Sequence, residues 1–291
     1  MNDCIVKNNN FAYFQASSNG GVISLSSTNV ALTIKFASFF QCKVFNSFLG
    51  GCVYFSSKSK AIFSNICANE CSAYRGYFLY VAGTQEDTIS SCMNRSIAAK
   101  CQGDSFSVCY FTYSNTLTRD HNATQCTAFI ERTTLHFWYC PWTNGAFHNF
   151  YRNKMSILYG IDSYTTENTL SHCNIISNTK HDEYYGAIHT YKGDKCALTI
   201  DNIYAFNNTQ CLISVSAGSI IISSMECDIY SSTGILVDTQ NVVINKDYTI
   251  RVPILSTINC DPMQKLRKMC TCKKQKLFSV CIILLIFIVK E

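Results

Sequence analysis

Short segments in which apolar and polar residues alternate recur along most of the chain, and several of them follow a glycine. An alternation with a period of two puts successive side chains on opposite faces of a β-strand, so each segment predicts a strand. The same alternation without a glycine predicts strands at Val108–Tyr113 and Thr134–Trp138. The glycines that open such segments are Gly20, Gly50, Gly76, Gly145 and Gly186.

A second pattern alternates with the first: Cys or Asn, an apolar residue two positions later, and Asn two or three positions after that. The glycine segments recur from Gly21 to Gly51 and, after a slightly shorter step, to Gly76. The step from Gly186 to its glycine-free equivalent, Cys211, equals that shorter step. An irregular repeat of this length indicates a solenoid. The second pattern begins at Cys4, Cys42, Asn65, Asn149, Cys173 and Asn202.

These residue types suit a β-helix. Small apolar residues and Cys can stack inside it, while Asn tolerates the left-handed conformation of sharp bends and forms ladders between turns. We therefore predict an all-β fold, a right-handed parallel β-helix solenoid over residues 1–250, followed by a short hydrophobic, helical tail. Residues 83–140 fit the repeat least well. We expect an irregular, loop-rich region there, with exposed loops at Thr84–Asp87 and Thr118–Asn122.

Composition supports a β fold and limits its chemistry. Hydrophobic residues make up 47% of the chain and charged residues only 15%, so the chain is too apolar to be disordered. The 18 cysteines are spread along the sequence and no two have the C-x-x-C spacing, so we predict neither a metal site nor a cofactor. A cysteine content this high is unusual for a reducing compartment.

The positive charge is concentrated near the C-terminus. Residues 265–291 hold seven basic residues and one acid, which leaves 17 basic and 18 acidic residues of the total 24 and 19 in the body of the chain. A body with a net charge near −1 offers no basic face for phosphates, so we expect no nucleic-acid partner.

Residues 251–276 are predicted to form a linker and a basic juxtamembrane stretch, and residues 277–289 a hydrophobic membrane tail. As a helix, the 13 uncharged residues would span about 20 Å, short of a hydrocarbon core of about 30 Å, unless flanking lysines reach the interface. A last strand or cap on the solenoid is the alternative for this segment. Cys270 and Cys272 are candidates for palmitoylation.

The topology stays open between two interpretations. The cysteines and the sequons at Asn94, Asn122 and Asn207 favour an extracellular solenoid at the cell surface. The basic run before the apolar tail, and an N-terminus without a signal peptide, favour a tail-anchored protein that faces the cytosol. A chain that begins in mid-solenoid would reconcile the two.

No catalytic set stands out in the sequence. The tripeptide Arg152-Asn153-Lys154 has the R-x-K form of a polygalacturonase subsite, but the acid pairs of such enzymes are missing. Asp120-His121 and the segment 181–183 are expected in polar surface loops. Exposed aromatic side chains could instead stack on a glycan or anchor a protein ligand on the solenoid face, and the candidates for these contacts are Trp138, Trp142 and Tyr185.

The segments Ser171–Asn178, Tyr185–Tyr191, Leu198–Asn202 and Ser223–Cys227 carry a family resemblance. They are similar to the repetitive right-handed parallel β-helix surface proteins of parabasalid protists. That family is related in pattern to bacterial polymorphic outer-membrane proteins and to the pectin-lyase-like fold. The resemblance implies a non-catalytic, membrane-associated surface protein, which we expect to act as an adhesion or recognition scaffold. A structural coat component is the first alternative, and a polysaccharide-acting lyase or hydrolase is the second.

Overall fold

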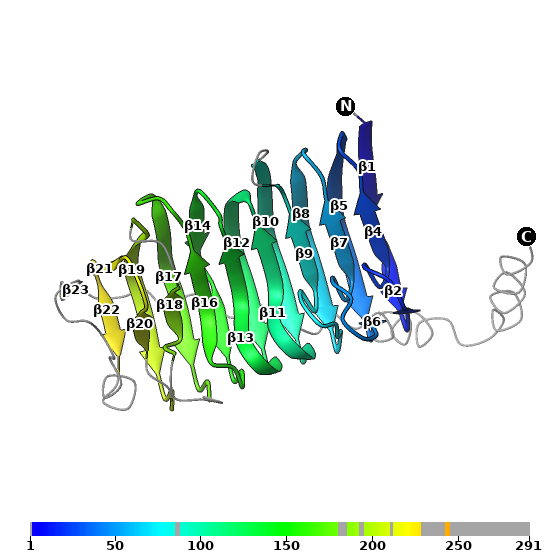
Figure 1. The fold of residues 1–291 in the computed structure, drawn as a ribbon. Helices are drawn as coiled ribbons and strands as arrows, with labels where there is room; N and C mark the ends of the chain where they lie inside the picture. The colour runs from blue at the N-terminus through cyan, green and yellow to red at the C-terminus, as the bar shows by residue number, and fades with distance from the viewer. Residues whose placement is uncertain are drawn as a thin grey trace, which may run out of the picture.

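The computed structural model describes residues 2–84, 88–179, 185–191, 195–209, 212–227 and 242–244. Within these ranges the regular elements are all strands, and the strands of successive turns pair in parallel. Figure 1 shows them stacked side by side into an elongated body. The chain is therefore a parallel β-solenoid, as the repeat pattern predicts.

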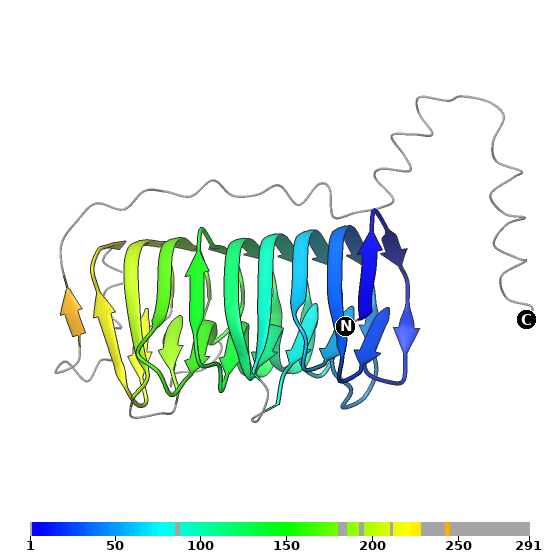
Figure 2. The same ribbon diagram turned by 90° about the horizontal axis from the view of Figure 1, so that it is seen from above.

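Two long parallel sheets form the walls of the solenoid, and the chain passes from one to the other in every turn (Figure 2). The first sheet contains β1 (Asn2–Lys7), β2 (Asn10–Ala12), β5 (Val30–Phe40), β8 (Ala61–Asn69), β10 (Ile89–Ala99), β12 (Ser114–Thr124), β14 (Thr143–Ala146), β15 (Asn149–Tyr151), β17 (Asn168–Ile176), β19 (Ala197–Phe206), β21 (Ser219–Ile222), β22 (Met225–Cys227) and β23 (Val242–Ile244). The second contains β4 (Ile23–Ser26), β7 (Val53–Ser56), β9 (Leu79–Ala82), β11 (Gln102–Thr112), β13 (Thr127–Trp138), β16 (Ile157–Asp162), β18 (Ile188–Thr190) and β20 (Ile213–Val215). A short pair, β3 (Gln15–Ala16) and β6 (Lys43–Val44), lies beside them.

The register between strands confirms the irregular repeat. Ile23 lies opposite Val53, which is the longer step that the first two glycine segments predict. Val53 lies opposite Leu79, and Ile188 lies opposite Ile213, and both of these steps are shorter. Turn length varies mainly because the corners absorb extra residues. Within the strands, an irregularity between Ser105 and Ser107 shifts the register of β11 against β13.

Each turn bends at two corners that lie five residues apart in the first sheet. Both corners place a residue in the left-handed region, for example Phe36 (φ 54°) and Gln41 (φ 50°) in the second turn. A non-glycine residue pays roughly 1 kcal/mol or more for this conformation, so paired strands on both sides must hold it in place. Asn, which the sequence analysis gave as suited to sharp bends, fills some of these corners. The corner pairs are Asn8/Tyr13, Phe36/Gln41, Asn65/Glu70, Arg95/Lys100, Asp120/Gln125, Phe147/Arg152, His172/Ser177 and Asn202/Asn207.

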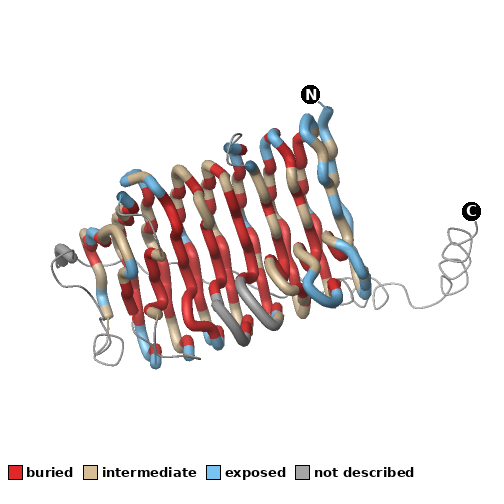
Figure 3. Tube along the Cα trace, in the orientation of Figure 1, coloured by how far each residue is buried: buried red, intermediate tan, exposed pale blue. Residues whose placement is uncertain are grey.

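The interior is filled by side chains that stack from turn to turn, and Figure 3 shows buried positions along the whole body. Phe111 and Phe137 occupy paired positions on β11 and β13, and their rings stack at 5.5 Å with an interplanar angle of 11°. Burying such a ring removes most of its apolar surface from water, which stabilises the fold at about 25 cal/mol per Å². The hydrophobic core is thus a set of ladders along the solenoid axis.

A further ladder runs along the corner that follows the first sheet. It begins as a row of cysteines and continues as a row of asparagines, all buried: Cys42, Cys71, Cys101, Cys126, Asn153, Asn178 and Asn208. The two rows join where the amide of Cys126 donates to Asn153 Oδ1 at 2.9 Å. The predicted stacking of Cys and Asn between turns is therefore confirmed.

The prediction of an irregular region at 83–140 is wrong. Residues 89–138 form four of the longest strands, β10 to β13, each of 11 or 12 residues. The pattern misleads because inward positions here are polar. Thr116 bonds to Ser91 at 3.0 Å and Thr118 to His148 at 3.0 Å, so these interior polar groups are satisfied within the core. Thr118 and Asn122, expected in an exposed loop, are fully buried in β12.

The second sequence pattern also groups residues that occupy different positions within a turn of the solenoid. Cys42 follows the corner after β5, whereas Cys173 points inward from the middle of β17. Asn149 sits in β15, one turn before Asn174. A period-two alternation looks the same in several registers, so spacing alone could not align the turns.

The described part of the chain contains no helix with the length and apolar character needed to cross a membrane. The predicted linker at 251–276, the tail at 277–289 and the palmitoylation candidates Cys270 and Cys272 lie outside the described residues.

Candidate functional site

A row of aromatic side chains runs along the outer face of the second sheet. Tyr54, Tyr80, Tyr110 and His136 hold paired positions on β7, β9, β11 and β13. Their successive ring centroids are 5.5, 5.1 and 4.9 Å apart. The spacing follows from the distance between paired strands, which brings equivalent side chains of adjacent turns into contact.

The row continues through a ring that comes from a loop. Gly160 pairs with both His136 and His189, so no side chain of β16 occupies the row. The ring of Tyr191 fills this place, 5.1 Å from His136 and nearly parallel to it at 7°. A Cβ on Gly160 would lie 3.0 Å from that ring, which explains the need for glycine. Tyr185 extends the cluster, 4.7 Å from His189.

A second row lies on the neighbouring edge of the solenoid. Tyr113, Tyr139 and Tyr164 stack with centroid distances of 5.4 and 5.2 Å. Trp138 joins the two rows, because its ring is 5.0 Å from Tyr139 and 5.7 Å from His136. We call the connected set the aromatic surface; its members are Tyr54, Tyr80, Tyr110, Tyr113, His136, Trp138, Tyr139, Tyr164, Tyr185, His189 and Tyr191.

An open groove of about 850 Å³ begins where the second row ends. Tyr164, 56% exposed, forms part of its wall together with Trp142. Glu167 and Lys195 supply one negative and one positive charge, and Thr165 and Thr166 add hydroxyl groups. The groove therefore combines two aromatic side chains with hydroxyl groups and with one side chain of each charge.

The two histidine rings of the aromatic surface are uncharged at neutral pH. Burial lowers the pKa of His136 to about 3, with the positive charge of Arg75 acting in the same direction. Burial also lowers the pKa of His189 to about 4. The same desolvation raises the pKa values of Tyr80 and Tyr110. Tyr110, His136 and His189 are buried, so a ligand would meet the exposed Tyr164 and the adjoining groove.

The structure brings the three aromatic candidates of the sequence into one region. Trp138 and Tyr185 belong to the aromatic surface, and Trp142 lines the adjoining groove with Tyr164. The sequence analysis missed the row formed by Tyr54, Tyr80, Tyr110 and His136. Each of these residues is one turn of the repeat from the next, so an alignment of the turns would have revealed the row.

The three sequons differ in exposure. Asn207 is exposed at a corner and Asn94 is half-buried. Asn122 is fully buried in the folded chain. It lies on β12, paired with Ile97 of β10 and Asn149 of β15.

The weaker catalytic candidates do not converge. Arg152 and Lys154 are exposed on a corner, as expected, and the Arg152 guanidinium lies 4.9 Å from the ring centre of Tyr151. His121 is fully buried, so its predicted place in a surface loop is wrong. Segment 181–183 lies outside the described residues. Among the described residues that line the groove, Glu167 is the one carboxylate.

The cysteines that the structure describes all carry free thiols, and most of them are buried. Cysteine is a small apolar residue when buried, so interior packing accounts for these side chains without disulfides. The cysteine content therefore gives no independent support for an oxidising compartment.

Comparisons with protein-family models, curated proteins and solved structures gave no match for this chain. The structure defines the class of fold: the chain is a parallel β-solenoid whose outer side carries rows of aromatic side chains. Membership of the parabasalid surface-protein family stays a prediction.

Proposed function

We propose that the chain is a non-catalytic recognition scaffold, a right-handed pectin-lyase-like β-helix whose aromatic surface and adjoining groove bind a neutral glycan. The observation that carries the proposal is the groove in which Trp142 and the exposed Tyr164 lie beside charged and hydroxyl groups, at the end of the series of rings that begins at Tyr54. The exposed ring of Tyr164 and the neighbouring ring of Trp142 line the groove and can stack on the apolar faces of sugar units. The charges and hydroxyls of the groove would then orient the sugar hydroxyls.

The two alternatives make different demands on this region. A retaining or inverting hydrolase needs a pair of carboxyl groups about 5–10 Å apart. The described groove residues contain the single carboxylate Glu167, which does not support that chemistry. A coat component would need no ligand at all, and only a binding measurement separates it from a recognition scaffold.

Replacing Trp142 and Tyr164 with alanine is expected to weaken glycan binding about tenfold or more. Each aromatic contact contributes about 0.5–1.5 kcal/mol, and both rings line the same groove. Binding would be screened on an array of neutral oligosaccharides and measured by calorimetry on the best one. Phe36→Ala, at an exposed corner away from the aromatic surface, is the matched control. If the double variant binds the glycan as tightly as the unaltered chain, the groove is not the binding site. If the unaltered chain binds no glycan, the result favours the structural coat component.

We further propose that the solenoid is held at a membrane and faces the outside of the cell, the alternative being a tail-anchored, cytosol-facing protein. The exposed sequon at Asn207 supports the outside location. An epitope inserted after Ser47, an exposed loop residue, should be labelled on intact cells that express the full chain.

Endoglycosidase treatment should lower the mass of the same protein. Asn207→Gln is expected to reduce this shift, whereas Asn122→Gln should not, because Asn122 is buried. Labelling only after permeabilisation, with no mass shift, would mean the cytosol-facing alternative.

A further inference from the structure

Three cysteine thiols converge inside the solenoid near its N-terminal end. Cys42 follows the corner after β5, and Cys71 follows the same corner one turn later, after β8. Cys52 comes from the opposite wall, just before β7. The three Sγ atoms all lie within 4.8 Å of one another, and all three residues are fully buried.

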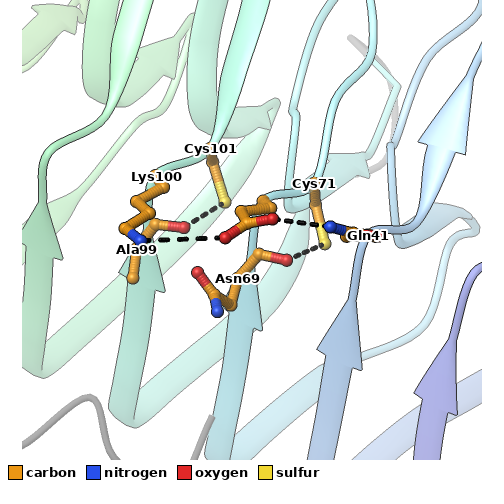
Figure 4. Close-up of polar contacts among 7 residues, drawn as sticks. Gln41, Asn69, Cys71, Ala99, Lys100 and Cys101 are labelled. Atoms are coloured by element: carbon orange, nitrogen blue, oxygen red, sulfur yellow. Dashed lines mark hydrogen bonds and ion pairs between the residues drawn. The ribbon is translucent and has the colours of Figure 1, made fainter. Parts of the chain in front are cut away.

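The corner that carries two of these cysteines is held by polar contacts on its outer side (Figure 4). The amide of Gln41 donates to Glu70 Oε2 at 2.7 Å, and Lys100 Nζ lies 3.8 Å from Glu70 Oε1. On the inner side, the Cys71 thiol donates to the carbonyl of Asn69 at 3.5 Å. Successive turns are therefore tied together at the point where the sulfur atoms meet.

Cys52 distinguishes this cluster from the rest of the cysteine row. Cys101 and Cys126 continue the row in later turns, and stacking in the core explains a row of that kind. It does not explain a third thiol that meets Cys42 and Cys71 from the opposite wall. Sulfur atoms at this separation need to move only slightly to reach the spacing of about 4.0 Å that a metal ion shared by three sulfur atoms, at about 2.3 Å from each, would impose.

We propose that Cys42, Cys52 and Cys71 form a binding site for a soft monovalent metal ion, Cu(I), coordinated by three sulfur atoms. Thiolate ligands select Cu(I), zinc and iron–sulfur clusters, and the cluster found among the described residues contains no carboxylate for a hard cation. Zinc prefers four ligands, whereas the cluster found among the described residues offers three.

The proposal is independent of the aromatic surface and is tested on the full chain. The protein is refolded from urea without oxygen, in the presence of Cu(I) held by a chromogenic chelator of known affinity, because the folded cluster is closed to solvent. One Cu(I) per chain should be retained against the chelator. X-ray absorption of the loaded, unaltered protein should show three sulfur ligands.

Cys52→Ala is expected to weaken Cu(I) binding about 100-fold or more, since it removes one of three ligands. Cys173→Ala is the matched control, because Cys173 is equally buried but lies outside the cluster. The double variant Cys270→Ala/Cys272→Ala tests whether the ion sits elsewhere in the chain, and it should bind normally. Circular dichroism of each variant separates loss of the site from loss of the fold.

Three results would overturn the site. The unaltered chain could release all Cu(I) to the chelator, or Cys52→Ala could bind as tightly as the control. An X-ray absorption spectrum dominated by nitrogen or oxygen ligands would also overturn it. This last measurement uses the unaltered protein, so it does not depend on whether a variant folds.

Discussion

Acidification from pH 7 to pH 5 is expected to destabilise the folded chain by about 8 kcal/mol. Four histidines, His121, His136, His148 and His189, are buried, with exposed fractions of 3% or less. Burial lowers the pKa values of His121 and His136 to about 3 and of His189 to about 4, and it holds that of His148 well below its usual range.

The sign follows from proton binding in the two states. Unfolded histidine has a pKa near 6.5, so between pH 6.5 and about 4 the unfolded chain binds protons that the folded chain does not. Stability is therefore fully present above pH 6.5 and falls as the pH falls toward 4. At pH 5 each histidine contributes about 2 kcal/mol to this loss, and the sum is comparable to the whole stability of many domains.

The central pair accounts for a large share of the effect. His121 and His148 lie in adjacent turns with ring centroids 6.2 Å apart. Their hydrogen bonds, His121 Nδ1 with Ser96 at 2.8 Å and His148 Nε2 with Thr118 at 3.0 Å, involve neutral hydroxyl partners. Neither bond offers a carboxylate to compensate a positive charge, so protonation favours unfolding.

Urea unfolding monitored at pH 7.5, 6, 5 and 4 would measure the loss. His148→Gln keeps a polar side chain in place and should flatten the pH dependence by about one quarter. His172→Gln, at a half-buried corner, is the control and should leave the slope unchanged. A midpoint that stays constant between pH 7 and pH 5 would contradict the prediction.

Asn178→Ala is expected to lower the free energy of unfolding by about 4 kcal/mol. Asn178 Oδ1 accepts from the backbone amide and the side chain of Asn153 at 2.9 and 3.0 Å. Its Nδ2 donates to the carbonyl of Phe150 at 2.8 Å and to Asn208 Oδ1 at 3.1 Å. Alanine would strand the buried amide of Asn153 and the carbonyl of Phe150, at about 1–3 kcal/mol each.

Denaturation by urea at pH 7.5 would test this ladder. Asn9→Ala is the matched comparison: its exposed side chain donates to the carbonyl of Lys7 at 3.0 Å, in contact with water, so its removal should cost less than about 1 kcal/mol. If the two variants lose similar stability, the asparagine ladder does not contribute as its geometry implies.

The sequence was informative wherever a side-chain preference acts locally. Alternating residues predicted strands such as Val108–Tyr113 and Thr134–Trp138, which fall within β11 and β13 apart from the corner residue Tyr113. Glycine spacing predicted both the length of the turns and its variation. The stacking of Cys and Asn was also foreseeable, because both residue types gain from contact with an identical neighbour.

Local residue preferences could not predict the register between strands of successive turns. Polar inward residues such as Thr116 and Thr118 look like a loop in sequence, because their partners Ser91 and His148 lie a full turn away. The same reason hid the burial of His121, whose partner Ser96 also lies a full turn away. A polar residue is acceptable in a core only when a distant partner satisfies it, and the sequence does not record that partner.

The class of fold, its turn length and the aromatic candidates Trp138, Trp142 and Tyr185 were thus determined by the sequence itself, since period, glycine and residue type act within a few positions. Only the tertiary structure decided which residues meet. It joined Tyr54, Tyr80, Tyr110 and His136 into one row and brought Cys52 from the opposite wall to Cys42 and Cys71. Contacts between turns depend on register, and register is set by the cooperative pairing of whole strands.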